Sequence, residues 1–300
     1  MSNENVLLIG GNGFIGRNLH ENLTNKCKKV VSIDRNDEDL RFSNKKLINC
    51  LKDSTDVFIL ASEVGAKAFN TNPVELYQNN KLLLDNIITS IEEVYANFGV
   101  KLNVSWFSSS EIYGNIDKNT FITEKTDIKL DINNKRTLYA LIKIIGEQLF
   151  SEMYQIGHIN SLNIYRLFNV SGRYQQKGVL YDMVKSAIDT KTIEFCDKTT
   201  RTITSVKYAI KTIIETAFSN KNDIQSINIH EERNSLYLKD LAKIVKNTIE
   251  DEFNVKNIKL IKKPVDNFIQ YRHTAIPNVN RCDENEIKHC IYQILEDFQK

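Results

Sequence analysis

The chain has 300 residues and nearly balanced charge, with 40 Lys and Arg against 38 Asp and Glu and a net charge of +2. No basic tract stands out and no apolar stretch approaches a membrane span, so we expect neither a nucleic-acid nor a membrane partner. Hydrophobic residues make up 41% and charged residues 26%, which is typical of a globular protein with one large domain or two modest ones.

The cysteines and histidines bear on compartment and metals. The five cysteines are scattered without a Cys-x-x-Cys motif, and the five histidines are isolated, so we expect reduced thiols and no metal site. A strand is predicted to begin within a few residues of Met1, which leaves no room for a signal peptide. These features predict a cytoplasmic protein.

Apolar, β-rich runs alternate with helical patterns in the first half of the chain. The predicted strands are Val6–Ile9, Val30–Ile33, Val57–Leu60, Val104–Phe107 and Leu162–Phe168, and the predicted helices are Phe14–Lys26, Pro73–Phe98 and Leu138–Ile156. Such alternation predicts an α/β fold, a Rossmann-type doubly wound parallel sheet with ligands at the carboxyl ends of its strands.

After about Gly172 the alternation becomes less regular. Helices are predicted at Leu180–Asp189, Lys207–Phe218 and Leu238–Asp251, and short strands near Thr192–Phe195 and Ile227–His230. We expect a dinucleotide-binding domain over residues 1–172 and a smaller mixed α/β substrate-binding region over 173–300. Some segments of the second region are expected to return to the first domain, and the region is expected to cover the open end of the sheet.

The predicted helix Leu138–Ile156 is apolar nearly all round. A helix of this kind must bury more than one face, and the sheet accounts for only one. A second copy of the chain is one candidate for the other face, which would give a homodimer. Coverage by the C-terminal region is the alternative.

A glycine-rich turn follows the first predicted strand. Gly10, Gly13 and Gly16 stand three residues apart, and a helical pattern begins at Phe14 and Ile15. Glycine lets the backbone approach a pyrophosphate closely, and the helix N-terminus offers free N–H groups to the anion. The turn therefore predicts a dinucleotide site and, with it, hydride transfer.

Asp34 ends the second predicted strand, where a carboxylate accepts hydrogen bonds from the adenosine ribose. Such a carboxylate repels a 2′-phosphate, so it favours NAD over NADP. Arg35 keeps NADP open, because an arginine at this place pairs with a 2′-phosphate. A solvated Arg35 that stacks on adenine is the alternative.

Tyr139 and Lys143 form a Tyr-x-x-x-Lys pair. Four residues apart on a helix, the two side chains share one face. A tyrosine phenol titrates near pH ~10, but a nearby ammonium and a positive nicotinamide stabilise the phenolate. The pair can then remove a proton from a substrate hydroxyl while a hydride leaves the same carbon.

The glycine spacing differs from the Gly-x-Gly-x-x-Gly of ordinary dehydrogenases. With Asp34 and the Tyr139–Lys143 pair, it resembles the extended short-chain dehydrogenase/reductase family, in its nucleotide-sugar epimerase/dehydratase branch. The resemblance covers most of the chain. It implies a nucleotide-diphosphate sugar whose hydroxyl, at C4, is oxidised to a keto intermediate with NAD as cofactor and Tyr139 as base.

Three further segments resemble cofactor-contacting parts of this family. Asp39 and Leu40 are similar to its adenine-contacting Asp-Leu pair. Ala61 and Ser62 resemble the small residues beside the pyrophosphate. Asn80 matches the asparagine that approaches the cofactor from the following helix.

The loop after Val104–Phe107 resembles the family's Ser-Ser/Thr-x-x-Val-Tyr-Gly segment, which makes Ser109 the hydroxyl that bonds the reacting sugar oxygen. Ser110 and Glu111 stand where members differ by reaction. This Ser-Glu pair is similar to GDP-sugar 4,6-dehydratases, whose glutamate removes the proton next to the transient ketone, and to UDP-glucuronate decarboxylases. The dTDP-glucose dehydratases carry an aspartate in place of Ser110. A surface carboxylate is the alternative for Glu111.

Phe168 and Asn169 lie in a segment that resembles the family's Arg-x-Phe-Asn-x-x-Gly. The resemblance implies that Phe168 lies near the nicotinamide and Asn169 near the substrate phosphates. Arg201 and Arg272 are similar to the two arginines that grip the diphosphate, since guanidinium groups form forked bonds to phosphate. A surface salt bridge is the alternative for each arginine.

The sequence thus predicts an NAD-dependent nucleotide-sugar epimerase/dehydratase, and Glu111 favours dehydration as the second step. An NAD(P)H-dependent 4-keto-sugar reductase is one alternative. The chain length favours it, as does the short segment between Asp34 and Val57, where the family's third strand is expected to be reduced as in reductase members. A non-catalytic NAD-binding regulatory protein is the other, and the intact Ser109, Tyr139 and Lys143 argue against it.

Overall fold

The structure is a computed structural model that describes residues 4–63, 71–219, 222–263 and 271–298. The chain divides into two compact units that interleave along the sequence. Unit 1 comprises residues 1–112, 130–166 and 210–227, and unit 2 comprises residues 113–129, 167–209 and 228–300.

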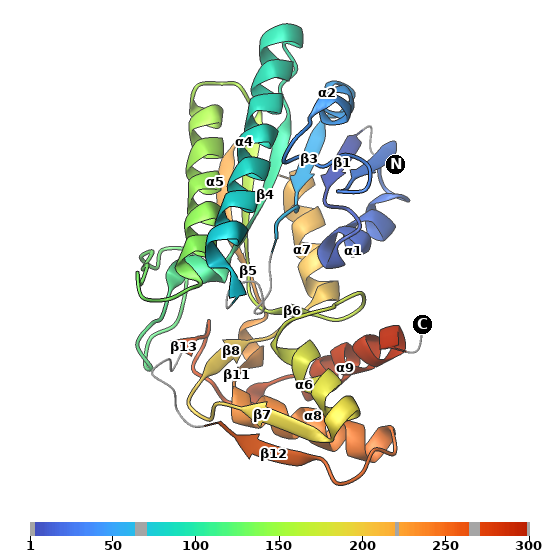
Figure 1. Ribbon diagram of the computed structural model, residues 1–300, viewed down its shortest axis with the longest axis vertical. Coiled ribbons are helices and arrows are strands. Elements are labelled where there is room, and N and C mark those ends of the chain that lie inside the picture. Colours follow the sequence, from blue (N-terminus) through green and yellow to red (C-terminus); the bar gives the residue numbers. More distant parts are fainter. Residues whose placement is uncertain (1–3, 64–70, 220–221, 264–270, 299–300) are drawn as a thin grey trace. The chain divides into compact units, whose positions relative to one another are not determined.

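Unit 1 is built on a six-stranded sheet with the order β10-β5-β4-β3-β1-β2 (Figure 1). Its strands are β1 (Asn5–Ile9), β2 (Lys29–Ile33), β3 (Asp56–Ile59), β4 (Asn103–Ser109), β5 (Ser161–Leu167) and β10 (Ile224–Ile229), the last of which ends in unit 2. The pairs β1–β2, β1–β3 and β3–β4 are parallel. The predicted Rossmann-type sheet is confirmed.

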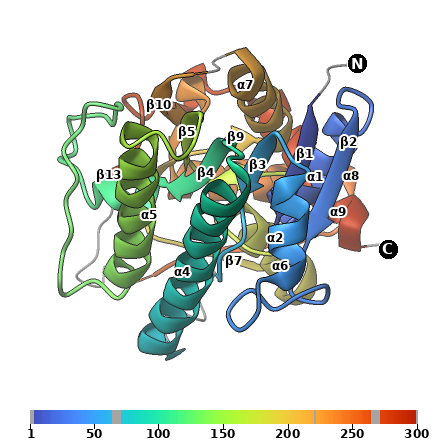
Figure 2. The same ribbon diagram turned by 90° about the horizontal axis from the view of Figure 1, so that it is seen from above.

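Three helices cover one face of this sheet: α2 (Lys45–Lys52), α4 (Pro73–Phe98) and α5 (Thr137–Gln155). Figure 2 shows α4 and α5 side by side along it. Because successive strand residues point to opposite faces, Leu7 and Ile9 of β1 both join the buried cluster beneath these helices. Burying this apolar cluster is the main source of stability for this layer.

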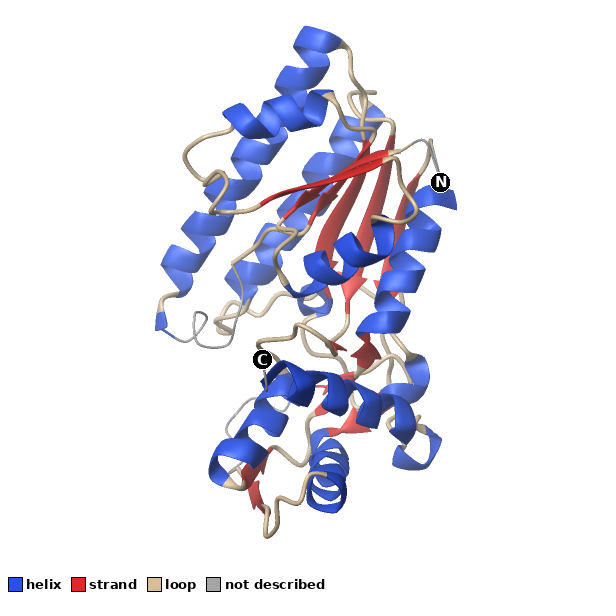
Figure 3. Ribbon diagram, turned by 90° about the vertical axis from the view of Figure 1, so that its right-hand side faces the viewer, coloured by secondary structure: helices blue, strands red, loops and turns tan. Residues whose placement is uncertain are grey.

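The opposite face carries α1 (Phe14–Leu23) and α7 (Val206–Ser219) (Figure 3). Phe58 of β3 points this way, and its ring centroid lies 6.3 Å from that of Phe218 in α7. Helices on both faces bury the central strands on both sides, as the continuous apolar runs in the sequence predict.

β2 lies at the edge of the sheet. The segment between Asp34 and Asp56, all of which the structure describes, contains α2 and no strand, so the predicted reduction of the third strand is confirmed. The helix itself was not predicted, because eight residues give little more than two turns in which to detect a period.

Helix α5 approaches β4 at Gly146, where a Cβ would lie 2.3 Å from the ring of Trp106. The helix also packs against α4 of the same unit, so α4 covers part of the face for which the sequence required a partner. Leu149 and Ile156 stay 37% and 60% exposed on this helix and just beyond its end.

Unit 2 combines helices α6 (Val179–Thr190), α8 (Leu238–Glu252) and α9 (Glu284–Phe298) with short strands. The strands are β6 (Val170–Ser171), β7 (Thr192–Phe195), β8 (Thr200–Thr202), β9 (Thr204–Ser205), β11 (Ser235–Tyr237), β12 (Lys259–Lys262) and β13 (Tyr271–Arg272). They form a three-stranded sheet β11-β8-β13 and the pairs β12–β7 and β6–β9. No helix among the described residues is long and apolar enough to cross a bilayer.

Candidate active site

In the glycine turn, the backbone of Gly10 packs closely against the backbone of Ala61 and of Gly16. Gly10 has φ +92°, and a Cβ there would lie 2.7 Å from the backbone nitrogen of Ala61 at the end of β3. A Cβ on Gly16, in the first turn of α1, would lie 2.4 Å from the carbonyl oxygen of Gly10. Side chains at these two positions would therefore force the turn open. This cradle fits the close backbone approach of a dinucleotide pyrophosphate.

Asp34 follows β2 and holds the glycine turn in place. Its Oδ2 accepts a hydrogen bond of 2.9 Å from the backbone N–H of Asn12. Burial raises the pKa of Asp34 above its usual value, the Asn12 hydrogen bond opposes that shift, and the negative charge of Asp37 adds to it. The carboxylate thus has a structural contact to the turn besides its predicted contact to the ribose.

A cavity of about 230 Å³ opens in front of this turn. Nine of the predicted cofactor residues line it: Gly10, Gly13, Asp34, Arg35, Asp39, Leu40, Ala61, Ser62 and Asn80. Phe14, Ile15 and Gly16 begin α1 directly after the turn and are not part of the lining. Glu38, Arg41, Glu63 and Asn79 line the cavity too, and no motif had marked them.

Asn80, which is 4% exposed, shapes the chain where β3 ends. Its Oδ1 accepts hydrogen bonds from the Ser62 hydroxyl (2.9 Å) and the Glu63 backbone N–H (2.8 Å). Its Nδ2 donates to the carbonyl oxygens of Glu63 and Leu76 at 3.0 and 2.9 Å. Asn80 therefore fixes the cavity wall from the first turns of α4.

Tyr139 lies in the first turn of α5, and its phenol is hydrogen-bonded to the hydroxyls of Ser62 and Ser109. Burial raises the pKa of Tyr139 well above its usual range, and the negative charge of Glu111 raises it further. The Ser62 contact was not predicted: it links the Tyr139 phenol to Asn80, a wall residue of the cavity.

Lys143 lies one turn further along α5 and is 2% exposed. Its Nζ donates a 2.8 Å hydrogen bond to the carbonyl oxygen of Phe107 and lies 5.5 Å from the centroid of the Tyr139 ring. Burial lowers the pKa of Lys143 to about 7, and the negative charge of Glu147 opposes that shift. Glu147 is itself held by Arg166, with Nη2 2.7 Å from Oε2.

Glu111 is paired with Arg136, a residue that no motif had marked. Arg136 Nη1 lies 2.8 Å from Glu111 Oε1, and the two side chains are 34% and 14% exposed. The Glu111 backbone N–H also donates to Ser109 Oγ at 3.2 Å. The one available signal was spacing, because Arg136 precedes Tyr139 by three residues and so lies one turn away. Ser110 is buried and opens the 3₁₀ turn Ser110–Tyr113.

Ser109, Glu111, Tyr139 and Lys143 thus come together in unit 1, where Ser110 and the predicted cofactor residues other than Phe168 also lie. Phe168, Asn169, Arg201 and Arg272 lie in unit 2. Phe168 there is fully buried, and Asn169 Nδ2 donates to the carbonyl oxygen of Thr202 at 3.2 Å.

Arg201 and Arg272 are in-register neighbours on the parallel strands β8 and β13. In-register residues of neighbouring strands project from the same face of a sheet, so both guanidinium stems leave one face. Arg272 Nε donates to the carbonyl oxygen of Gly114 at 2.9 Å, and Arg201 Nη1 to that of Thr200 at 2.7 Å.

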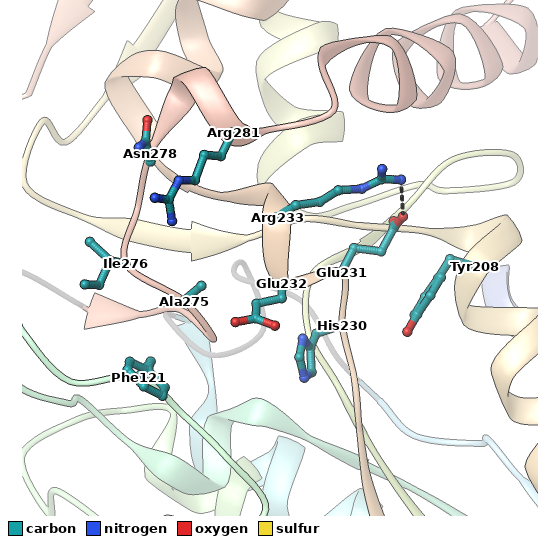
Figure 4. Close-up of a pocket in the computed structure, with 10 residues that line it drawn as sticks. All are labelled: Phe121, Tyr208, His230, Glu231, Glu232, Arg233, Ala275, Ile276, Asn278 and Arg281. Carbon is teal, nitrogen blue, oxygen red and sulfur yellow. Dashed lines mark ion pairs between the residues drawn. The ribbon is translucent and has the colours of Figure 1, made fainter.

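A second cavity, of about 710 Å³, lies in unit 2 (Figure 4). It is lined by Phe121, Tyr208, His230, Glu231, Glu232, Arg233, Ala275, Ile276, Asn278 and Arg281. Arg233 pairs across it with Glu231 at 3.7 Å. None of the predicted substrate residues is among this lining. Among the described residues, no group of three or more His, Cys, Asp or Glu is placed to hold a metal ion.

Several solved structures share this fold. UDP-N-acetylglucosamine 4-epimerase from Methanobrevibacter ruminantium M1 is 21% identical, with a TM-score of 0.78 and coverage of 99% of this chain and 100% of that one. UDP-glucose 4-epimerase from Thermus thermophilus, solved with NAD, is 17% identical, with a TM-score of 0.78 and coverage of 97% and 99%. The dTDP-glucose 4,6-dehydratase DesIV from Streptomyces venezuelae is 16% identical, with a TM-score of 0.76 and 98% coverage of both chains.

No curated protein matches the chain in sequence. The sequence profile of the NAD dependent epimerase/dehydratase family matches residues 6–256, which confirms the predicted family and, with it, the enzyme class and NAD as cofactor. The glycine cradle, Asp34 and the paired Tyr139 and Lys143 all lie inside the matched segment. The chain belongs to the NAD dependent epimerase/dehydratase family.

Proposed function

We propose that the protein oxidises a hydroxyl of a nucleotide-diphosphate sugar, at C4, to a ketone, with Tyr139 as the base. The observation that carries this proposal is the Tyr139 phenol, which is hydrogen-bonded to Ser109 and lies one helical turn from Lys143. Ser109 forms a hydrogen bond with the oxygen of the sugar's C4 hydroxyl. The proton of that hydroxyl passes to Tyr139 as a hydride leaves C4. Bound NAD supplies the hydride acceptor.

Lys143 supports the ionised form of Tyr139. Its ammonium, 5.5 Å from the ring centroid, attracts the phenolate through a buried, low-dielectric environment. The hydrogen bond to the Phe107 carbonyl fixes the Nζ position, because a buried ammonium has few other partners. Lys143 is therefore a positioning and electrostatic residue, while Tyr139 carries the proton.

For the second step we propose dehydration, with Glu111 as the base. Arg136 pairs with the Glu111 carboxylate. The Glu111 backbone N–H donates to the hydroxyl of Ser109, the residue that ends β4 directly before the short turn Ser110–Tyr113. Glu111 removes the proton from C5, next to the C4 ketone, and the C6 hydroxyl leaves with a proton as water. Return of the hydride to C6 and of a proton to C5 then completes a 4-keto-6-deoxy sugar. The two protons taken from the C4 hydroxyl and from C5 are thus returned, one to the leaving hydroxyl and one to C5, so the net change is loss of one water.

For the substrate we propose a sugar linked to a nucleoside diphosphate. The neighbouring arginines Arg201 and Arg272 suit the two phosphates, and Asn169 lies beside β8. Solved relatives with UDP-glucose or UDP-glucuronic acid and NAD share the fold, at 20% identity.

Mass spectrometry tests the proposal. The protein and NAD are incubated with GDP-mannose, UDP-glucose, UDP-N-acetylglucosamine, UDP-glucuronic acid and dTDP-glucose. A product lighter by one water supports dehydration. Loss of carbon dioxide would instead indicate decarboxylation, and unchanged mass with altered chromatography would indicate epimerisation. If no nucleotide sugar is turned over, the non-catalytic alternative gains.

The second candidate is a 4-keto-sugar reductase that runs the hydride step in reverse. The edge position of β2, with no strand in the described segment between Asp34 and Asp56, favours it. Consumption of NADH or NADPH with a 4-keto nucleotide sugar, and a product heavier by two hydrogens, would support this candidate. It fails if the reduced cofactor is stable in the presence of that sugar.

We also propose a homodimer through α4 and α5. Leu82 of α4 and Leu149 of α5 are 43% and 37% exposed, although both are large and apolar. Light scattering of the wild type and of Leu149→Glu tests this, with a dimer expected for the first and a monomer for the second. A monomeric wild type would contradict it.

A further inference from the structure

Two arginines lie at the cavity end where Asp34 is placed to meet the ribose, and both are already bound. Arg35 follows Asp34 directly, and Arg41 comes six residues later. A guanidinium at this place is what a 2′-phosphate needs, so the sequence alone left NADP open. The structure shows what each guanidinium contacts.

Arg41 is bound by Asp39 in a forked arrangement. Its Nη2 lies 2.6 Å from Oδ2 of Asp39, and its Nε lies 2.9 Å from Oδ1. The hydrogen bond from Arg41 lowers the pKa of Asp39 to about 2, so Asp39 is ionised at neutral pH. Both donor directions of this guanidinium edge are thereby used.

Arg35 is bound by Glu63, which approaches from the end of β3. Arg35 Nη2 lies 3.4 Å from Glu63 Oε1, with side-chain exposures of 59% and 35%. An exposed pair of this length adds little stability by itself. The Glu63 carboxylate is, however, held in place by contacts that do not involve Arg35.

Glu63 is fixed by two asparagines of α4. Its Oε2 accepts a 2.7 Å hydrogen bond from Asn79, and its backbone N–H and carbonyl both bond to the buried Asn80. The carboxylate therefore stays at the cavity wall whether or not Arg35 moves. To bind Arg35, a 2′-phosphate would have to break the ion pair between Arg35 and Glu63, while the Glu63 carboxylate remains at the cavity wall.

The balance of charge works in the same direction. Among the described lining residues, four carboxylates, from Asp34, Glu38, Asp39 and Glu63, stand against two guanidiniums. A phosphate placed here meets a net negative wall in addition to occupied arginines.

We propose that Glu63 is a specificity-determining residue for the cofactor: it occupies Arg35, as Asp39 occupies Arg41, so that neither arginine binds the 2′-phosphate of NADP. The inference concerns cofactor binding alone and does not depend on the sugar chemistry proposed above. Asp34 follows β2 and Glu63 follows β3. Asp34 is expected to repel the 2′-phosphate directly, whereas Glu63 acts by binding Arg35, the cation that would otherwise attract that phosphate.

Calorimetric titration with NADH and NADPH, without any sugar, tests this in the full chain. Glu63→Gln keeps an acceptor for Asn79 but removes the charge that holds Arg35. We expect the affinity for NADPH to rise about tenfold, the effect of one recovered charge-assisted phosphate contact, while that for NADH changes by less than about threefold. Adenosine 2′,5′-bisphosphate should gain by the same factor, and 5′-AMP should not.

The double variant Glu63→Gln/Arg35→Gln tests whether Glu63 acts by binding Arg35 or through its negative charge alone. If Glu63 acts through Arg35, the gain in NADPH affinity disappears in the double variant. The proposal is overturned if Glu63→Gln leaves NADPH binding unchanged, or if the gain survives without Arg35, since the removed charge would then act directly on the phosphate. The urea unfolding midpoint of Glu63→Gln, which should match that of the wild type, serves as the control for folding.

Discussion

The two ends of the site in unit 1 treat charge in opposite ways. Around Asp34, at the cavity wall, carboxylates and guanidiniums pair at partly exposed positions, and Asp39 is held in its ionised form. At the other end, Tyr139 and Lys143 are enclosed, and burial shifts both pKa values toward the neutral forms. The exposed end is thus suited to selecting a ligand, and the enclosed end to a base whose ionisation depends on its neighbours.

The largest expected effect lies at the enclosed end. Lys143→Met removes the ammonium beside Tyr139, and we expect turnover of the substrate to fall by about 100- to 1000-fold, the range for loss of acid–base assistance. Lys81→Met, at an exposed lysine of α4, is the matched control and should retain full activity. Steady-state rates for the two variants give the comparison, and near-normal turnover in Lys143→Met would contradict the role given to Lys143.

The glycine cradle gives the next effect. Gly16→Ala would place a Cβ 2.4 Å from the Gly10 carbonyl oxygen, so we expect NADH affinity to fall by about tenfold or more and stability to fall by about 1–3 kcal/mol. Gly99→Ala is the control, because its Cβ meets no described atom within 4 Å although φ is +66°. That variant should lose about 1 kcal/mol of stability with NADH affinity intact. Equal NADH affinity in both variants would contradict the role of the glycine turn in cofactor binding.

Glu111→Gln separates two effects of the Glu111 carboxylate: its influence on the pKa of Tyr139 and its proposed role as the base of the dehydration. The negative charge of Glu111 raises the pKa of Tyr139, so its removal lowers that pKa, and the hydride step should reach its full rate at lower pH. The proposed dehydration should stop, so reduced cofactor accumulates on the enzyme. Stopped-flow absorbance across a pH series measures both effects. A shift of the profile to higher pH would show that the sign is wrong.

The smallest effect is on stability. The pKa of Lys143 is about 7 in the folded chain and lies below its ordinary value of 10.5, so between these values the unfolded chain binds more protons. Stability should therefore rise with pH across this window, by about 1.4 kcal/mol per pH unit at most. Urea unfolding of the wild type and of Lys143→Met, at neutral and mildly alkaline pH, compares them. If the difference in the free energy of unfolding between the wild type and Lys143→Met does not change with pH, the lowered pKa of Lys143 is contradicted.

Sequence patterns predicted the elements and the local spacing of the site better than the contacts between distant segments. The Tyr139–Lys143 spacing needs only helical geometry, and the sheet needs only apolar runs separated by helices. The pairing of Glu63 with Arg35 joins the segment after β3 to the segment after β2, and Arg136 reaches Glu111 across 25 residues. Such contacts arise from tertiary packing and leave no local period to read. In unit 2 the predicted strand Thr192–Phe195 is present as β7. The two-residue strands β6, β9 and β13 escaped prediction, since two residues cannot show alternation.

The central claim is that Tyr139 takes the proton as the sugar is oxidised. The most direct measurement is single-turnover reduction of bound NAD, followed by nicotinamide absorbance, in the wild type and Tyr139→Phe with the nucleotide sugar that the mass-spectrometric panel identifies. We expect Tyr139→Phe to bind NADH normally and to reduce NAD at least about 100-fold more slowly, because the variant lacks the phenol that takes the sugar's hydroxyl proton. Reduction at the wild-type rate in Tyr139→Phe would contradict it.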